Sequence, residues 1–420
     1  MREMKDSGIE WIGQIPFSWK CSPIGSEFFE ISQRNIFFKE KKALKFTFGQ
    51  IVEKNDFNEN IDDYVEKTIR NYTVVKPGDI VLNGLNLNFD FVTQRVGLVK
   101  TNGIITSAYS SFRIKNPKLI NAEFVTYLFK TYDSCKSFHN MGGGVRKILN
   151  FSELKKYYFI YPSITEQTKI VSLLNKKCSE IDALTADIQT QIETLEEYKK
   201  SVITEAVTKG LDPNVEMKDS GIEWIGKIPA DWDVFKGKYV LKYLQKPVKQ
   251  EDDVITCFRD GEVTLRKNRR EDGFTMSDKE IGYQGVDVGD LVVHGMDGFA
   301  GAIGISDSRG KASPVLNVLD SSMVKKFIMY YLRSMAYGNV FTAIATGIRV
   351  RSCDLRWNKL ANLPYPVPPF EEQRQIADFL DHKSSEIDQT ISEKQQQLET
   401  LAEYKKSLIY EYVTGKKEVA

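Results

Sequence analysis

Two clusters of basic side chains give the sequence its clearest potential for chemistry, which is the binding of phosphate groups. The denser cluster fills five positions and contains Arg266, Lys267, Arg269 and Arg270. The other is a lysine-rich stretch at positions 39–45 that includes Lys42. Cations of this kind bind nucleic-acid phosphates, which supplies affinity but carries no sequence information. A solvated surface without a ligand is the alternative interpretation of either cluster.

Side chains suited to reading base edges lie in one polar segment of the first half, at positions 83–95. They are Asn83, Asn86, Gln94 and Arg95. Asn and Gln can pair bidentately with adenine, and Arg can pair in the same way with guanine. Taken alone, an asparagine-rich loop also fits a plain turn, which is its commoner meaning.

Matching glycine-arginine segments occur in the two halves, as GGGVRK at 142–147 and TGIRVR at 346–351. Glycine lets a backbone approach a phosphate closely, and an arginine follows it after one intervening residue. The segments add four candidates for DNA contact, which are Arg146, Lys147, Arg349 and Arg351. A plain turn is again the alternative.

Motifs for catalysis are missing from the sequence. It has no GxxxxGK[ST] loop for ATP, no GxGxxG, no HExxH, and no [NDS]PP[YFW] motif of amino-methyltransferases. Five scattered cysteines without a CxxC pair and three histidines predict no metal site and reduced thiols. There is no apolar run of membrane-spanning length and no signal peptide. We therefore expect a cytoplasmic binding protein that is not an enzyme and carries no cofactor itself.

An internal repeat organises the elements that must position these residues. The sequence MKDSGIEWIG occurs at 4–13 and again at 217–226. Strong agreement returns between 166–208 and 372–414, at a constant offset of 206 positions. The blocks between share only a skeleton, such as KPGDIVL against DVGDLVV. The repeated tryptophans are expected in the core, and they are Trp11, Trp19, Trp224 and Trp232.

Each of the two strongly matched segments predicts one long helix, because apolar residues recur every three or four positions. The predicted stripes consist of Ile181, Leu184, Ile188, Ile192, Leu195 and Val202 in the first helix, and of Ile387, Ile391, Leu398, Leu401 and Leu408 in the second. Two copies of one stripe in a single chain favour an antiparallel coiled coil. The alternative is that each stripe packs on its own globular block.

The blocks outside the helices contain short Val- and Ile-rich runs broken by glycine, which predict twisted sheet with a few helices. The expected class is α+β, with two α/β globular domains separated by two long helices and related by a pseudo-twofold repeat. The expected division is residues 1–160 with the opening repeat 4–19, 161–216, 217–364 with the opening repeat 217–232, and 365–420.

The formal net charge of +1 hides a division between basic blocks and acidic helices. Residues 20–160 hold 21 Lys+Arg against 14 Asp+Glu, and residues 233–364 hold 20 against 16. The helical segments are acidic, with 6 against 10 in 161–216 and 7 against 11 in 365–420. This distribution favours binding of nucleic acid by the globular blocks.

Three sets of motifs together resemble the conserved regions of Type I restriction-modification specificity subunits. One is YPxxxEQxxI at 161–170, with its partner YPVPPFEEQRQI at 365–376. Another is LEEYKKSVITEAVTKG at 195–210, with LAEYKKSLIYEYVTGK at 401–416. The third is MKDSGIEWIGxIPxxW, which opens each half. The resemblance covers the whole chain in the right order.

The family implies that each variable block is a target recognition domain and that the helix pair holds the two domains apart. Its members read bipartite, asymmetric double-stranded DNA targets in a prokaryotic cytoplasm, as part of phage defence. Two adenine methyltransferase (M) subunits and restriction/translocase (R) subunits are the implied partners. The implied cofactors, S-adenosylmethionine, ATP and Mg²⁺, belong to those partners. A coiled-coil interaction scaffold without DNA recognition is the competing hypothesis.

The phase of the repeat adds a prediction about the chain ends. The closing VTGKKEVA corresponds to VTKGLDPNVE, which leads directly into the second MKDSGIEWIG. Residue 1 lies three positions before the first copy. The sequence therefore behaves as if it were cyclic, and we expect its two ends to lie close together at a helix junction.

Overall fold

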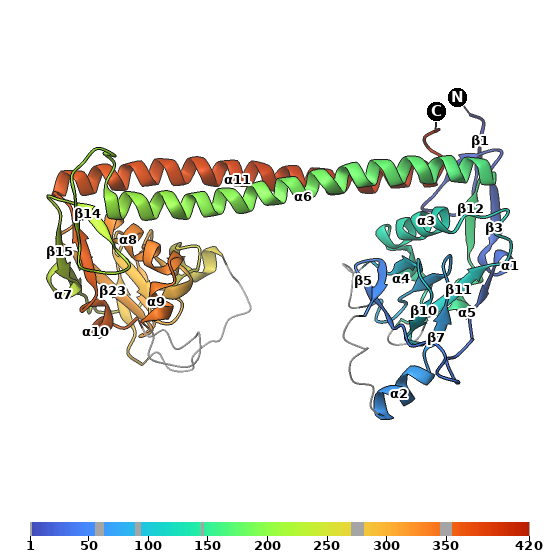
Figure 1. Cartoon of the computed structure of the whole chain (residues 1–420), viewed down its shortest axis with the longest axis horizontal. Helices are drawn as coiled ribbons and strands as arrows, with labels where there is room; N and C mark the ends of the chain where they lie inside the picture. Colours follow the sequence, from blue (N-terminus) through green and yellow to red (C-terminus); the bar gives the residue numbers. More distant parts are fainter. Residues whose placement is uncertain are drawn as a thin grey trace. The chain divides into compact units, whose positions relative to one another are not determined.

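The computed structural model describes residues 2–54, 63–88, 94–143, 147–269, 281–344 and 355–419, and these form two compact units (Figure 1). Unit 1 comprises Met1–Ile188 and Gln396–Ala420, and unit 2 comprises Gln189–Gln395. Each unit contains one globular block and parts of two long helices. Among the described residues, no helix combines the length and apolar character needed to cross a bilayer.

A four-stranded antiparallel sheet forms the centre of each block. Its strand order is β4-β11-β8-β9 in unit 1 and β16-β23-β20-β21 in unit 2. Two-stranded ribbons surround it, namely β1-β2, β12-β3, β10-β7 and β5-β6 in unit 1, and β13-β14, β15-β24, β19-β22 and β17-β18 in unit 2. Every described strand of unit 1 thus has a counterpart in unit 2.

The strands are short in both units. Those of unit 1 are β1 (Met4–Asp6), β2 (Gln14–Pro16), β3 (Lys20–Pro23), β4 (Phe28–Glu30), β5 (Leu44–Thr47), β6 (Gln50–Glu53), β7 (Thr73–Val75), β8 (Ile80–Leu82), β9 (Val96–Leu98), β10 (Gly103–Ile105), β11 (Ser110–Ile114) and β12 (Tyr158–Tyr161). Those of unit 2 are β13 (Met217–Asp219), β14 (Lys227–Pro229), β15 (Asp233–Lys236), β16 (Leu241–Tyr243), β17 (Ile255–Cys257), β18 (Val263–Leu265), β19 (Gln284–Val286), β20 (Leu291–His294), β21 (Ile303–Ile305), β22 (Gly310–Ala312), β23 (Leu316–Ser321) and β24 (Pro364–Val367).

The helices follow the same order in the two halves, except that α2 has no described counterpart in unit 2 and the short helices η2 and η3 have none among the described helices of unit 1. The helices before residue 210 are α1 (Ile24–Glu27), α2 (Asp63–Arg70), α3 (Ala122–Ser134), α4 (Ser137–Met141), α5 (Phe151–Leu154) and α6 (Ile164–Lys209). Those after it are α7 (Gly237–Val240), η2 (Arg266–Asn268), η3 (Gly298–Ala300), α8 (Lys325–Tyr337), α9 (Val340–Ala343), α10 (Trp357–Leu360) and α11 (Phe370–Val413). The predicted α+β class and both predicted long helices are confirmed.

Aromatic side chains fill the core of unit 1 between the sheet and α3. Phe28, Phe112, Phe129 and Phe159 are fully buried and meet mostly edge to face, with ring centroids 5.2–6.4 Å apart. The helix starts where the Asn121 side chain accepts hydrogen bonds from the Glu123 and Phe124 N–H groups. This core fixes the sheet that carries the loops described below.

The repeated Glu-Gln pair at the start of each long helix joins that helix to its block. In unit 1 the buried Gln167 accepts from the Asn121 N–H at 2.7 Å and donates to the Pro162 carbonyl at 2.9 Å. Glu166 accepts from the indole N–H of the buried Trp19 at 3.3 Å. The repeat therefore encodes a joint of hydrogen-bonded, water-excluded groups.

Unit 2 repeats this joint with the matching residues. Gln373 accepts from the Val324 N–H at 2.9 Å and donates to the Pro368 carbonyl at 2.8 Å, while Glu372 accepts from the Trp232 indole at 2.9 Å. Trp19 and Trp232 are thus core residues, as predicted. Trp224 departs from that prediction because 38% of its surface is exposed.

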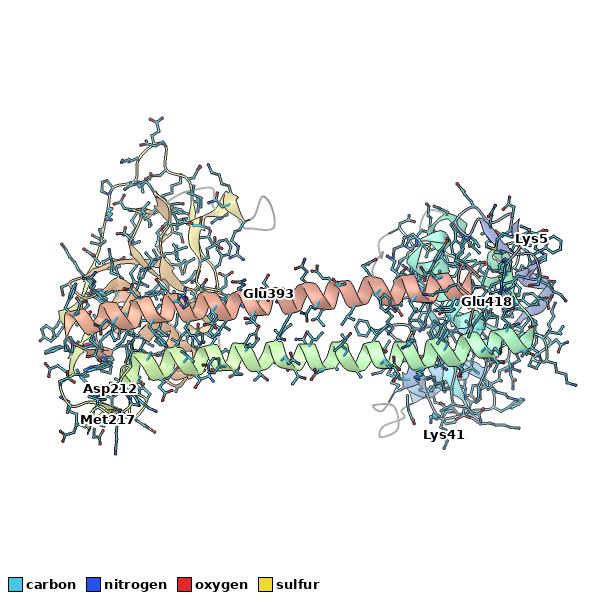
Figure 2. The ribbon with its side chains drawn as sticks, turned by 90° about the horizontal axis from the view of Figure 1, so that it is seen from above. Lys5, Lys41, Asp212, Met217, Glu393 and Glu418 are labelled. Carbon is cyan, nitrogen blue, oxygen red and sulfur yellow. The ribbon has the colours of Figure 1, made fainter. Side chains whose placement is uncertain are left out.

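Helices α6 and α11 run antiparallel within each unit (Figure 2). In unit 1, Asp182 pairs with Lys405. In unit 2, Lys199 pairs with Asp388 at 2.6 Å, and Gln191 lies against Lys394. The residue numbers of the paired side chains increase along α6 as they decrease along α11, which shows that the two helices are antiparallel.

Most of the predicted seam lies between these helices. Ile181, Ile188, Ile192, Ile387 and Leu408 are buried, and Leu195, Val202, Ile391, Leu398 and Leu401 are half-buried. The prediction is wrong for Leu184, which is 47% exposed. Leu184 lies two residues from the Asp182–Lys405 ion pair, where Glu403 of α11 is exposed as well.

The two chain ends meet in unit 1, as the cyclic repeat predicts (Figure 1). Arg2 forms ion pairs with Glu166 at the start of α6 and with Glu418, at 2.8 Å, near the end of the chain. A Cβ added at Gly415 would meet Pro16 and Trp19, and one added at Gly210 would meet Pro229 and Trp232. The end of α11 therefore meets the first repeat in the way that the end of α6 meets the second.

A chain opened after Gly210 and joined from Ala420 to Met1 is expected to fold. Residues 416–420 and 1–3 would join Gly415 to Met4, and the native connection from Gly210 to Met217 is the similar segment 211–216. Circular dichroism and the thermal unfolding midpoint of the permutant should match those of the native chain. The matched control is a permutant opened after Thr185 inside α6, which should unfold at a lower temperature. Equal loss of structure in both permutants would contradict the cyclic interpretation.

Candidate nucleic-acid interface

The loop that follows β8 in unit 1 carries several of the predicted DNA-contacting residues. It is fixed by a hydrogen bond from the Leu149 N–H to the Gly84 carbonyl at 2.9 Å. A Cβ at Gly84 would lie 1.8 Å from the Leu149 oxygen, so only glycine fits. In unit 2 the Leu355 N–H donates to the Gly295 carbonyl at 2.8 Å. In each unit, the segment that follows the glycine-arginine motif is thus hydrogen-bonded to an equivalent loop, which follows β8 in unit 1 and β20 in unit 2.

Asn86 and Lys147 lie on neighbouring segments of the loops described above. The Leu87 N–H donates to the Lys147 carbonyl at 3.2 Å. Both residues are exposed, and both have left-handed backbones, with φ of 53° at Asn86 and 36° at Lys147. Sequence-distant candidates are therefore brought together here.

Arg95 requires a correction, because it does not face solvent. Only 1% of its surface is exposed, and its guanidinium donates to the carbonyls of Asn83 at 3.1 Å and Leu85 at 2.7 Å. Its backbone N–H donates to the Asp133 carboxylate at 2.7 Å. An arginine engaged in this way shapes the loop and is not available to guanine.

The other predicted residues of this segment differ in availability. Gln94 is exposed and lies against the turn of the β5–β6 hairpin, where a Cβ on Gly49 would come within 2.4 Å of its Oε1 atom. Asn83 is half-buried, and its side-chain oxygen accepts from the Leu85 N–H. Lys42 pairs with Glu53 across the base of the hairpin at 2.9 Å.

In unit 2 the basic cluster is partly neutralised by its own surroundings. Lys267 pairs with Asp253, and Arg269 pairs with Asp260 at 2.6 Å and Glu262 at 2.9 Å. Arg266 donates to the Thr256 hydroxyl at 3.3 Å. Phosphates would have to compete with these carboxylates, so the cluster attracts them less than the sequence predicts.

Four predicted residues lie outside the described residues. They are Arg146, Arg270, Arg349 and Arg351.

Carboxylates and cations form a further network in unit 2. Arg309 pairs with Asp252 at 2.8 Å and with Asp287 at 2.5 Å, and Lys246 bridges Asp287 and Asp290, both at 2.7 Å. Hydrogen bonds from Lys246 and Arg309 lower the pKa of Asp287 to about 2. This network ties the segments around β19 and β22 together.

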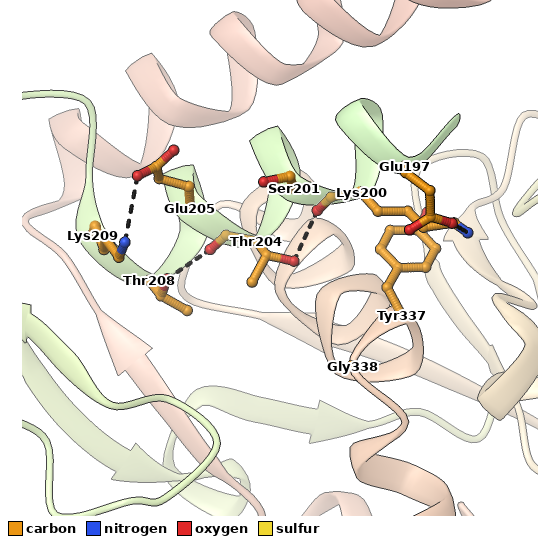
Figure 3. Close-up of a pocket in the computed structure, with 9 residues that line it drawn as sticks. All are labelled: Glu197, Lys200, Ser201, Thr204, Glu205, Thr208, Lys209, Tyr337 and Gly338. Atoms are coloured by element: carbon orange, nitrogen blue, oxygen red, sulfur yellow. Dashed lines mark hydrogen bonds and ion pairs between the residues drawn. The ribbon is translucent and has the colours of Figure 1, made fainter. Parts of the chain in front are cut away.

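An open depression on α6 beside the end of α8 offers little chemistry (Figure 3). Lys209 pairs with Glu205 at 3.4 Å, and the Thr204 and Thr208 hydroxyls donate to carbonyls of their own helix.

Within the described ranges, no three His, Cys, Asp or Glu side chains are grouped to hold a metal ion. The described cysteines Cys21, Cys135, Cys178 and Cys257 are free thiols.

Comparison with known proteins gives a consistent likeness to one family. The profile of the Type I restriction modification DNA specificity domain matches residues 18–194. The chain is 24% identical to the putative type I restriction enzyme MjaX specificity subunit of Methanocaldococcus jannaschii, over 96% of this chain and 95% of that one. It is 27% identical to the MjaVIII specificity subunit of the same organism, over 82% and 80%. This chain is therefore similar, over most of its length, to specificity subunits of Type I restriction enzymes.

Solved structures share the fold of this chain. A chain solved to describe complex assembly and conformational transition of the type I R-M system superposes with a TM-score of 0.71 at 14% identity, covering 96% of this chain and 99% of that one. The HsdS subunit from Thermoanaerobacter tengcongensis superposes with a TM-score of 0.51 at 14% identity, covering 96% and 98%. The structural likeness at this identity concerns the fold.

Sequence reasoning missed three exposed residues near these loops. Phe48 lies at the turn between β5 and β6, and Met296 and Arg259 lie near the loop after β20. The Phe-Gly pair at positions 48–49 differs from the Asn-Gly, Asp-Gly and Gly-Gly pairs that signal a two-residue hairpin, so the sequence carried no such signal for the exposure of Phe48. His294 also helps to shape the loop after β20, because its Nδ1 atom accepts hydrogen bonds from the Met296 and Asp297 N–H groups.

The Arg95→Met variant is expected to lose stability, because the Asn83 and Leu85 carbonyls would lose their buried partner. A loss of about 1–3 kcal/mol in the free energy of unfolding is expected. Urea unfolding of the full chain measures it, with exposed Gln94→Ala as the neutral control, expected within about 0.5 kcal/mol of the native chain. Unchanged stability of Arg95→Met would show that Arg95 does not hold the loop.

The Arg309 network should make unit 2 sensitive to acid. The folded-state pKa of Asp287 is lowered from 3.8 to about 2, so its contribution is present above about pH 4 and is lost as the pH falls toward 2. Arg309→Met should lower the unfolding midpoint at pH 7 and flatten its decline between pH 4 and pH 2. Exposed Lys238→Met removes the same charge and should leave the profile unchanged. Parallel profiles for the native chain and Arg309→Met would refute the assignment.

Proposed function

We propose that the two units read the two parts of a bipartite, asymmetric DNA target. The observation that carries the proposal is the combination of a shared skeleton with unlike loops. The sheets correspond strand for strand, and Gly84 and Gly295 accept the same hydrogen bond from Leu149 and Leu355. The exposed residues differ, with Asn86, Gln94 and Lys147 in unit 1 and Arg259 and Met296 in unit 2.

Electrostatics support the same proposal. The variable blocks carry the excess of Lys and Arg, whereas the helical segments carry the excess of acidic residues. Phosphate contacts by exposed cations such as Lys147 would position each unit on the duplex, and amides such as Asn86 and Gln94 would pair with base edges. Arg95 would act by holding the loop that presents them.

The proposed partners are two adenine methyltransferase subunits and restriction/translocase subunits, for which this chain serves as scaffold and DNA reader. It contributes no catalytic group in this proposal. S-adenosylmethionine, ATP and Mg²⁺ are bound by the partners. A methyltransferase that modifies an adenine must take it out of the base stack, so a reader that fixes the register of the duplex would determine which adenine is reached.

The competing function is a coiled-coil scaffold that binds proteins without reading DNA. That function predicts tolerance of Lys147→Ala and of substitutions in the 266–269 cluster. DNA reading predicts that Lys147→Ala weakens binding across sequences and reduces the dependence of affinity on salt.

Long-read methylation mapping tests the proposal. Two samples of DNA are compared. One comes from cells that express this chain together with the methyltransferase encoded beside it, and the other comes from cells that express the methyltransferase alone. A split N6-methyladenine motif that requires this chain is expected. Co-purification of the subunits without any such motif would leave the scaffold function in its place.

A domain exchange within the same experiment assigns the half-sites. Replacing residues 20–160 by a second copy of 233–364 should turn the asymmetric motif into one with two like halves, because both positions would then carry the same reading surface. A motif that keeps both original halves would contradict the assignment of one half-site to each unit.

A further inference from the structure

The tip of the β5–β6 hairpin in unit 1 carries a phenylalanine in an unfavourable conformation. The register pairs Thr47 with Gln50, so the turn contains only Phe48 and Gly49. Both have positive φ, 46° at Phe48 and 71° at Gly49. This is the pattern of a type I′ turn, in which Asn or Gly normally takes the first position.

The described residues of unit 1 leave this aromatic side chain uncovered. Phe48 exposes 84% of its surface. Positive φ is a genuine outlier for a bulky residue, and such strain is characteristic of positions that serve function. The hairpin itself would be served better by asparagine.

The base of the hairpin holds this tip firmly. Leu44 is buried in a cluster with Val75, Val81 and Ile105, and Phe46 packs on that cluster with its ring 5.9 Å from that of Tyr109. The tip is therefore presented by a packed ribbon, which suits insertion into a partner.

The surroundings of the tip are those of a DNA-contacting surface. Gln94 lies directly against Gly49, and exposed Lys45 belongs to the same strand as Phe46. The block around them holds 21 Lys+Arg against 14 Asp+Glu. A polyanion with apolar base faces fits this combination better than an acidic or purely apolar protein surface does.

The corresponding hairpin of unit 2 is different. Strands β17 and β18 are joined by a longer loop, in which the Phe258 ring is covered by Arg269 at 4.3 Å. Arg259 in that loop pairs with Asp297 at 2.8 Å. An uncovered aromatic tip is thus a property of unit 1 and not of the shared skeleton.

We propose that Phe48 is an apolar wedge that contacts the bases of the half-site read by unit 1, at a step where the duplex is kinked. The proposal rests on the proposed function. DNA-binding proteins insert phenylalanine and similar side chains between base steps, and pyrimidine–purine steps yield most easily. The wedge would add specificity through the deformability of the step as well as through direct contact.

The test uses the full chain assembled with its methyltransferase subunits and a labelled duplex that carries the mapped motif. Phe48→Asn should raise or preserve the thermal unfolding midpoint, because Asn-Gly favours this turn. It should weaken binding of the target about five-fold or more, since stacking of a base on an aromatic ring is lost. The slope of affinity against salt should stay unchanged, because no phosphate contact is removed.

Two variants complete the test. Phe48→Trp keeps an aromatic wedge and should retain binding, and Phe17→Ala removes an exposed phenylalanine from the opening repeat and should also bind normally. Native affinity in Phe48→Asn, or an equal loss in Phe17→Ala, would overturn the wedge while leaving the proposed function intact. Failure of the native assembly to prefer the mapped duplex would overturn both.

Discussion

The fold depends on one buried joint that is made twice, where each long helix starts. Gln167 and Gln373 are buried amides that satisfy backbone groups on two separate segments at once. Removing such a side chain would leave several buried polar groups without partners, which costs more than the hydrogen bonds themselves contribute. The tryptophan of each opening repeat completes the joint by donating to the adjacent glutamate. The tryptophan and the Glu-Gln pair recur in the sequence because this joint is built from them in both units.

A fixed joint leaves the outer loops free to differ. The strand pairing of the two central sheets is the same, and the glycine after β8 and β20 accepts the same hydrogen bond. What varies is the chemistry at the tips, where unit 1 presents amides and a phenylalanine and unit 2 presents arginine and methionine. Binding residues on loops supported by a rigid scaffold can be changed without loss of the fold.

Electrostatic interpretation has to separate net charge from available charge. The 266–269 cluster is dense in sequence, yet Lys267 and Arg269 are paired with carboxylates of the same unit. Arg95 is the opposite case of a cation whose role is internal, since its guanidinium is buried against carbonyl groups. Exposed Lys147 is a better candidate for phosphate, although it belongs to no dense cluster.

The sequence by itself determined the α+β class, the two long helices, most of their apolar seam and the proximity of the chain ends. These properties depend on local sequence or on the periodicity of apolar residues. Because the pattern occurs in both halves of the sequence, a prediction made for one copy is supported by the other. The exposure of Leu184 was not predictable, because it depends on which residue of α11 lies opposite.

Only the tertiary structure decided which candidate residues are available to a ligand. Asn86 and Lys147 are brought together by one backbone hydrogen bond between distant segments, and Arg95 is withdrawn into the interior. Phe48 is left uncovered by a turn whose backbone angles no composition reveals. Residue type and spacing specify what a side chain can do, but burial and partners depend on chain segments that are remote in sequence.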